Sequence, residues 1–477
     1  MQFAVFAVAG HYLSPAEFGI YAVISSIHIL LFRCAQAGWR EYIASSDREA
    51  ALDAHAFGLS IVGSVLLTLL GVSAAWAMTL IDSVKDYALL QALLSMSLIG
   101  TGPYSIWAGF LVRERRAATL AKVDLAAQLS GGLATIAGLY FGHGFDALGF
   151  GRLSTQLLNA LALWPLVGWT AGLRFSSHAG RAILQFNRNL LGAKLIGYLQ
   201  GYAATLVVGV FLGPAAVGLY RAGSRVVASL AEVLSEPLRM VCWMSLRTAV
   251  DGAATGEHGR GSAETSPANP AADEARLAGL SQASEGFLTM ALAVTTPIYL
   301  GLAVTAEPIM VVLLGEQWRD AAPIVSILAL SSLVATPLLL SDPLLSLARR
   351  VEQIPRLNLI LGMATVVAVP LSAPFGVVPT AVGQFLAACV SVWVSVRAYG
   401  RFGRVDIGKA LRGGLPSFAA SLAMVAVLAL VRTTALDWIS TQALRLTLEV
   451  LLGMLVFIPL FAMLGGFRRI TAVLARS

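Results

Sequence analysis

Five charged side chains share one face of the apolar stretch 216–245. They are Arg221, Arg225, Glu232, Glu236 and Arg239. At about 100° per residue, their positions fall within roughly 60° of a helical face. Charge is costly inside a membrane-spanning helix. This stripe is therefore expected to line a hydrated cavity, or alternatively to hold neighbouring helices together while pairing with itself.

A second apolar stretch, 18–40, holds a single charge at its middle, Arg33. A guanidinium group binds phosphate through two parallel hydrogen bonds and keeps its charge at physiological pH. We therefore expect a cavity that binds an anionic substrate, with phosphate as the best-suited group. Its candidate residues are Arg33, Arg221, Arg225 and Arg239.

Three carboxylates are candidates for ion coupling: Glu232, Glu236 and Asp124. The two glutamates reduce the positive charge of the stripe, which leaves room for a proton-coupled step beside anion binding. Asp124 has two interpretations, because Lys122 and Arg116 stand close to it in the sequence. It either pairs with one of these cations or takes part in ion coupling.

No pattern in the sequence predicts a metal site, a cofactor site or a catalytic centre. The three cysteines, Cys34, Cys242 and Cys389, are far apart in apolar segments, and the six histidines are scattered. The motifs of zinc proteases, serine hydrolases and P-loop proteins do not occur. The net charge of +7 is dispersed along the chain, which argues against nucleic-acid binding. We expect no cofactor, no metal and no enzymatic activity.

The composition indicates an all-α polytopic membrane protein. Of the 477 residues, 57% are apolar and 12% are charged, about half the charge of a soluble domain, so lipid is the solvent that fits. A helix needs about twenty apolar residues to cross a bilayer, and about fourteen transmembrane helices are expected. The predicted spans are 1–12, 18–40, 56–82, 88–112, 118–141, 147–170, 189–212, 216–245, 281–314, 322–347, 357–374, 378–398, 413–431 and 444–464.

Two of these spans have unusual lengths. The stretch 281–314 is too long for one plain span, so an interfacial turn is expected inside it. The first span has about half the length of a crossing helix and lacks the basic region that opens a signal peptide. We expect this first helix to be truncated, with the true start of the protein upstream.

The placement of lysine and arginine predicts a topology with both termini in the cytoplasm. With that orientation, most of the 33 basic residues fall in cytoplasmic breaks between spans. The basic residues expected on the opposite face are few: Lys85, Arg152, Arg319, Arg432 and Arg445.

Residues 249–275 are rich in glycine, alanine, serine and proline. Such a segment buries too little apolar surface to become ordered, so we expect a flexible cytoplasmic linker. The predicted organisation is a six-helix bundle over 1–170, a cytoplasmic connection over 171–188 and a second six-helix bundle over 189–398 that contains the linker. Residues 399–477 add two helices and a cytoplasmic tail.

The two bundles show an internal repeat. LSPAEFGIY at 13–21 recurs as LGPAAVGLY at 212–220, a shift that also aligns Arg33 with the stripe. Beyond the linker, a larger shift carries Arg115-Arg116 onto Arg349-Arg350. A shift of six spans keeps the orientation, so we expect parallel repeats related by an axis along the membrane normal, as in transporters that rock two bundles about a central site.

The sequence LSPAEFGIY at 13–21 resembles the opening of polysaccharide flippases of the Wzx and exopolysaccharide type, and GVFLGPAAVGLYRAG at 209–223 resembles their seventh and eighth helices. Nearly the whole chain is similar to the superfamily that also holds MATE multidrug exporters and the lipid II flippase. The resemblance implies transfer of an undecaprenyl-pyrophosphate-linked oligosaccharide to the periplasmic leaflet of a bacterial inner membrane, for exopolysaccharide, O-antigen or capsule synthesis. It implies alternating access around a central cationic cavity. The implied partners are the lipid-linked oligosaccharide, membrane lipids, a polysaccharide polymerase and a chain-length regulator.

Two other functions stay open. A MATE-like, cation-coupled multidrug exporter would favour an acidic, aromatic cavity, and the arginine content of the candidate cavity argues against it. A membrane polymerase or acyltransferase would show a large periplasmic loop or a histidine and aspartate motif, and the predicted periplasmic breaks are short.

Overall fold

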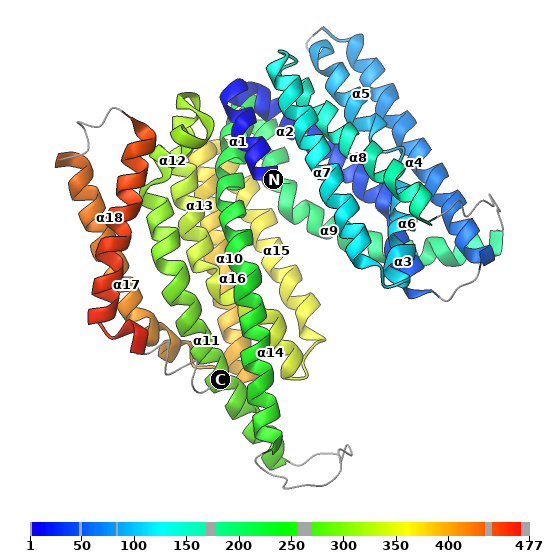
Figure 1. Cartoon of the computed structure of the whole chain (residues 1–477). Coiled ribbons are helices and arrows are strands. Elements are labelled where there is room, and N and C mark those ends of the chain that lie inside the picture. The colour runs from blue at the N-terminus through cyan, green and yellow to red at the C-terminus, as the bar shows by residue number, and fades with distance from the viewer. Residues whose placement is uncertain are drawn as a thin grey trace. The chain divides into compact units, whose positions relative to one another are not determined.

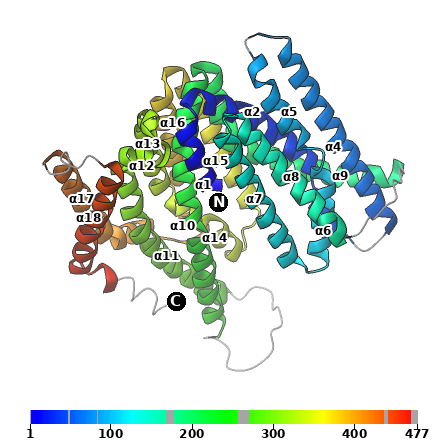
Figure 2. The same ribbon diagram turned by 45° about the horizontal axis from the view of Figure 1, so that its top comes forward.

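The computed structural model describes residues 2–46, 50–82, 84–167, 177–255, 270–434 and 441–468, and the regular elements in these ranges are all helices. The chain divides into two compact units, Met1–Gly218 and Leu219–Ser477. Each unit is a bundle of helices (Figures 1 and 2). The predicted all-α fold is therefore confirmed for the described part of the chain.

The first unit contains nine α-helices, a short 3-10 helix and the opening turn of α10 in its described residues. These helices are α1 (Gln2–Tyr12), α2 (Pro15–Gln36), α3 (Trp39–Ser45), α4 (Ala50–Thr79), η1 (Lys85–Tyr87), α5 (Ala88–Met96), α6 (Thr101–Arg113), α7 (Ala117–Tyr140), α8 (Asp146–Val167) and α9 (Ser177–Leu212). A capping box fixes the start of α2, because the Glu17 N–H donates to the Ser14 hydroxyl at 3.3 Å and the Ser14 N–H donates to the Glu17 carboxylate at 2.8 Å.

The first unit has a core of bulky side chains and a seam of small residues. Ile43 of α3 is fully buried, and the rings of Phe57 and Trp107 bring α4 and α6 together with centroids 5.8 Å apart. Between α7 and α8, Gly131 and Gly151 face each other so closely that a Cβ on either would strike the backbone of the other helix. Such small residues allow membrane helices to pack at short distance.

The second unit is built from the rest of α10 and the helices that follow. They are α10 (Pro214–Thr255), α11 (Pro270–Val304), α12 (Ala306–Leu314), η2 (Glu316–Ala321), α13 (Ala322–Val334), η3 (Thr336–Leu340), α14 (Ser341–Leu347), α15 (Gln353–Ser372), η4 (Ala373–Phe375), α16 (Val377–Gly403), α17 (Ile407–Thr434) and α18 (Gln442–Met463). Cys242 of α10, Phe287 of α11 and Leu344 of α14 meet in one buried cluster. The fully buried Tyr399 of α16 fixes this core, because its hydroxyl lies 2.6 Å from that of Ser341.

The described residues of each of the fourteen predicted spans lie on one helix or on consecutive helical segments, while residues 1 and 168–170 lie outside the described part of the chain. Seven described helices are long and apolar enough to cross a membrane, or eight if a pair bent by 42°, Glu316–Val334 and Thr336–Leu347, counts as one span. The turn expected within 281–314 occurs between α11 and α12. The single spans expected at 88–112 and 322–347 are instead broken.

The two broken spans end in the same backbone conformation. α6 and α14 are each followed by an arginine with positive φ, 59° at Arg115 and 58° at Arg349. In both turns the N–H of the following arginine donates a hydrogen bond back to the end of the helix. Arg116 N–H donates to the Leu111 carbonyl and Arg350 N–H to the Leu345 carbonyl, each at 2.8 Å. Non-glycine residues rarely adopt this left-handed conformation. The arginine pairs matched in the sequence therefore share a local structure.

The helices reach beyond the predicted domain boundaries. α10 continues to Thr255 and α11 begins at Pro270, so both extend into the predicted linker, and its remaining residues, 256–269, lie outside the described part of the chain. α9 begins at Ser177, inside the predicted connection 171–188. It packs within the first unit, where the Tyr198 hydroxyl donates to the Ser26 carbonyl at 2.7 Å.

The two repeated Pro-x-x-x-Gly turns of the sequence lie against each other in the first unit. A Cβ on Gly19 of α2 would overlap the Pro214 carbonyl, and a Cβ on Gly218 of α10 would overlap the Pro15 carbonyl. Each glycine therefore makes room for the proline turn of the other motif. The contact is reciprocal, which explains why both copies of the motif carry glycine at this position.

A buried carboxylate joins the last two helices. Glu449 of α18 is 1% exposed and accepts two hydrogen bonds from the Arg432 guanidinium of α17, at 3.1 and 3.0 Å. Arg445, one turn before it, lies 3.5 Å from the same carboxylate. From the sequence, both arginines are expected on the membrane face opposite the cytoplasm. Their shared partner was missed, although Glu449 is the single acidic residue in the predicted span 444–464.

Alanine at Gly19 or Gly218 is expected to destabilise the protein by about 2 kcal/mol, because an added Cβ must displace backbone rather than a flexible side chain. Gly201→Ala is the matched control, since this helical glycine has no neighbour within 4 Å of an added Cβ. The melting temperature of the purified protein in detergent should fall for the first two variants and stay equal or rise for the control. An equal melting temperature in all three would contradict the close contact.

Replacement of Glu449 by glutamine is expected to cost about 3–5 kcal/mol, because two arginines lose their buried counter-charge. Glu274→Gln serves as the comparison, since its ion pair with Arg404 is exposed, with 71% and 61% of the side-chain surface accessible. Exposed pairs contribute about 0–1 kcal/mol. Thermal denaturation of both variants, followed by loss of the monodisperse peak in gel filtration, measures the difference. Equal losses would show that Glu449 has no special structural role.

Candidate substrate-binding site

The charged stripe of the sequence lies on the exposed side of α10 in the second unit. The opposite side of the helix, which includes Val226, Leu238 and Cys242, is buried. The Glu232 and Arg239 side chains are 66% and 47% exposed. Arg221 and Arg225 are half-buried at the edge of the stripe.

Two ion pairs form within the stripe. The Arg225 Nη1 atom lies 3.5 Å from Glu232 Oε1, and the Arg239 Nη2 atom lies 3.0 Å from Glu236 Oε1. The self-pairing expected as the alternative is therefore present. Because exposed pairs of this kind contribute little to stability, a substrate that binds both guanidinium nitrogens at once can compete for the arginines.

Arg33 lies on α2 of the first unit and is exposed. It makes no ion pair or side-chain hydrogen bond with the described residues. The positive charge of Arg33 is therefore not neutralised by a carboxylate of the described chain. Arg33 belongs to the first unit, whereas the stripe on α10 belongs to the second.

Arg152 is a second cation of the first unit that sequence reasoning assigned to the far face of the membrane. It lies within α8, and its guanidinium carbon is 4.6 Å from the centre of the Phe32 ring on α2. Within the described residues it has no ion pair. Its position inside the predicted span 147–170 was the signal that could have identified it, because an arginine within a span suggests function.

His28 is a further polar group beside Arg152. Its side chain is 3% exposed, and neither ring nitrogen has a hydrogen-bond partner in the described chain. The His28 ring centre lies 6.1 Å from that of Phe32, the ring on which Arg152 stacks. Arg152 also interacts electrostatically with Arg33. The first unit therefore gathers positive charge and unused hydrogen-bonding capacity between α2 and α8.

Asp124 has a partner that the sequence did not suggest. The Tyr104 hydroxyl of α6 donates to its carboxylate at 2.5 Å. Among the described residues, neither Lys122 nor Arg116 pairs with Asp124, and Arg116 lies 3.5 Å from Glu114 instead. Of the two interpretations of Asp124, the ion pair with Lys122 or Arg116 does not occur among the described residues, where Tyr104 on the neighbouring helix binds one carboxylate oxygen instead.

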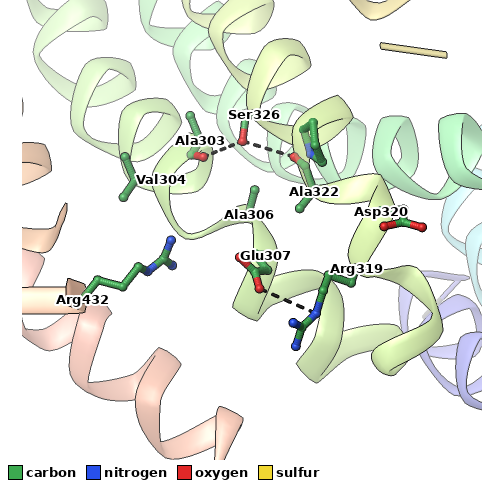
Figure 3. Close-up of a pocket in the computed structure, with 10 residues that line it drawn as sticks. Ala303, Val304, Ala306, Glu307, Arg319, Asp320, Ala322, Ser326 and Arg432 are labelled. Atoms are coloured by element: carbon green, nitrogen blue, oxygen red, sulfur yellow. Dashed lines mark hydrogen bonds and ion pairs between the residues drawn. The ribbon is translucent and has the colours of Figure 1, made fainter. Parts of the chain in front are cut away.

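The second unit also contains a cavity of about 510 Å³. Figure 3 shows its walls, which come from α11, α12, η2, α13 and α17. The lining residues are Ala303, Val304, Ala306, Glu307, Arg319, Asp320, Ala322, Pro323, Ser326 and Arg432. Sequence reasoning did not identify this cavity, because its walls come from segments more than a hundred residues apart.

A protein family and one curated relative match the sequence. Residues 11–251, about half of the chain, match the family described as polysaccharide biosynthesis protein. The succinoglycan biosynthesis transport protein ExoT of Rhizobium meliloti (strain 1021) is 24% identical over 350 residues, which cover 71% of this chain and 64% of that relative. The chain thus spans less than two thirds of the length of ExoT.

Two solved structures share the fold. The lipid II flippase MurJ, in an inward closed conformation, superposes with a TM-score of 0.70 at 12% identity and covers 97% of this chain and 96% of its own. An inward-facing multidrug resistance MATE family transporter of the MOP superfamily gives a TM-score of 0.62 at 14% identity, with 84% and 94% covered.

These matches agree with the resemblance drawn from the motifs at 13–21 and 209–223, both of which lie within the matched region. The proteins that the chain resembles are transporters and flippases by name, in agreement with the expectation that it is not an enzyme. By the match over residues 11–251, the chain belongs to the polysaccharide biosynthesis protein family.

Proposed function

We propose that this protein is a flippase that moves an undecaprenyl-diphosphate-linked oligosaccharide to the periplasmic leaflet of a bacterial inner membrane. One observation carries the proposal above all: helices of a polysaccharide biosynthesis protein hold arginines that lack a carboxylate partner in the described chain. Arg33 of α2 and Arg152 of α8 are the two examples. The named activities of the matched transport protein and flippase support the same class of substrate.

A diphosphate is the ligand that these cations fit best. A charged side chain inside a membrane needs a partner or water, and neither Arg33 nor Arg152 has a carboxylate partner among the described residues. A diphosphate offers several oxygen acceptors to the planar guanidinium fork. His28, with two unpaired ring nitrogens beside Arg152, can supply a further hydrogen bond.

In the second unit, the arginines of the stripe form only weak ion pairs. Arg225 and Arg239 pair with exposed glutamates, and the diphosphate replaces these glutamates when it binds. Protonation of Glu232 or Glu236 would release the arginines and favour the substrate-bound state, which links anion binding to a proton. Asp124, already bound by Tyr104, is a weaker candidate for this role.

The proposed transport cycle is alternating access about a central cationic cavity. The proposal includes about fourteen spans, parallel repeats, and both termini and the linker in the cytoplasm. The recurring left-handed turns at Arg115 and Arg349 support the repeat. A polysaccharide polymerase and a chain-length regulator are the proposed partners in the membrane. A cation exporter is disfavoured, because Glu232 and Glu236 are each paired with an arginine rather than free for a cationic drug.

Arg225→Ala is expected to abolish delivery of the lipid-linked glycan to the periplasm while the protein still inserts. Arg225→Lys should restore only part of the activity, because lysine keeps the charge but loses the fork. Arg247→Ala is the matched control on the same helix, since Arg247 pairs with Asp251 one turn away at an exposed position. The measurement is glycan export in a host that lacks its own gene. Full export by a variant without Arg33, Arg221 and Arg225 would contradict the anion-binding role.

Cysteine labelling tests the proposed topology. In a variant without the native cysteines, Ser262→Cys in the linker should resist a membrane-impermeant maleimide in intact spheroplasts and react after lysis. Asp82→Cys is the opposite control, because Asp82 is 97% exposed in the turn after α4, on the predicted periplasmic side. Labelling of residue 262 in intact spheroplasts would reverse the orientation.

A further inference from the structure

The cavity of the second unit is separate from the charged stripe and has no role in the function proposed above. It lies where α11 ends and α12 begins, with η2, the start of α13 and the end of α17 as its other walls. α11 has 35 residues and, at 1.5 Å per residue, is about 52 Å long. The cavity is therefore at the end of α11 opposite the linker, which is the periplasmic end in the proposed topology.

The lining combines small apolar side chains with charges of both signs. The small apolar residues of the lining include Ala303, Val304 and Pro323. The charged residues of the lining are Glu307, Asp320 and two arginines. Figure 3 shows the ion pair between Glu307 and Arg319 at 3.7 Å on one wall. The lining therefore carries charges of both signs, two carboxylates and two guanidinium groups. It offers many hydrogen-bond donors and acceptors beside apolar surface.

Arg432 enters the cavity as a fixed donor. Its Nε and Nη2 atoms donate to the buried Glu449 at 3.1 and 3.0 Å, which sets the orientation of the whole guanidinium group. Its Nη1 atom makes no hydrogen bond with the described residues, and Figure 3 shows the side chain extending from α17 toward Val304. A donor that is already oriented loses little entropy on binding a ligand.

Asp320 is the matching acceptor. Its carboxylate is exposed and has no ion pair within the described chain, although Arg319 next to it pairs with Glu307 and Glu316. The cavity therefore presents one fixed donor, on α17, and one open acceptor, on η2, together with small apolar side chains.

We propose that this cavity binds the uncharged sugar residues of the glycan at the periplasmic end of the protein. A sugar ring has an apolar C–H face, which suits the small apolar residues of the lining, and a rim of hydroxyl groups, which both donate and accept hydrogen bonds. Asp320 accepts from the hydroxyls and Arg432 donates to them. The volume of about 510 Å³ lies in the usual range for ligand pockets, about 300–1,000 Å³. The inference rests on the proposed function, because it assigns a place to the glycan of the same substrate.

The experiment separates sugar binding from diphosphate binding. The full-length protein in nanodiscs is titrated with two probes: the free oligosaccharide released by mild acid from the host's lipid-linked glycan, and undecaprenyl diphosphate without sugar. Val304→Trp fills the cavity, and Asp320→Asn removes the open carboxylate while keeping its shape. Both variants should bind the oligosaccharide at least tenfold more weakly and undecaprenyl diphosphate as the unmodified protein does. Val390→Trp, at a position 49% exposed on α16, is the control and should match the unmodified protein for both probes.

Each outcome bears on one of the two proposals. Equal binding of the oligosaccharide by all variants, or no binding by the unmodified protein, would overturn the sugar site. Failure of the unmodified protein to bind undecaprenyl diphosphate would instead contradict the flippase function. Asp320→Asn changes an exposed side chain, so a monodisperse gel-filtration profile for this variant ensures that a loss of binding is not a loss of fold.

Discussion

The structure depends on the fact that lipid cannot solvate a charge. In the described chain, two buried carboxylates are matched by arginines on neighbouring helices: Asp53 by Arg113 at 2.7 Å, and Glu449 by Arg432 at 3.0 Å. These pairs hold helices together, because removal of either partner would leave a buried charge alone. Against this background, an unmatched arginine such as Arg152 is informative. Matched charges stabilise the fold, and the unmatched charges are the ones to which we assign the proposed substrate.

The arginines of the two units differ in whether they have carboxylate partners, and the proposed mechanism depends on this difference. In the first unit, Arg33 and Arg152 have no carboxylate partner among the described residues, and His28 adds unsatisfied nitrogens. In the second unit, Arg225 and Arg239 are balanced by exposed glutamates. In the proposed mechanism, a diphosphate would supply the negative charge that Arg33 and Arg152 lack and would compete with the weak ion pairs of Arg225 and Arg239.

Close packing of backbones complements the pairing of charges. Gly19 and Gly218 accept each other's proline turns, and Gly131 faces Gly151 between α7 and α8. Since lipid provides little hydrophobic drive for helix association, such contacts depend on shape. They concentrate at helix ends and crossings. The exposed side of α10, by contrast, stays open for its charged stripe.

The helix positions and the main charged stripe could be predicted from the sequence, because apolar runs, helical period and repeated motifs are local properties. The described residues of the predicted spans lie on helices, and the arginine pairs at 115–116 and 349–350 form turns of the same conformation. The partners of charged groups could not be predicted in the same way. Tyr104 bound to Asp124, Arg432 bound to Glu449, and the cavity beside α12 each join different helices. Only tertiary packing decides which faces meet, since contact across helices depends on their rotation and crossing rather than on sequence spacing.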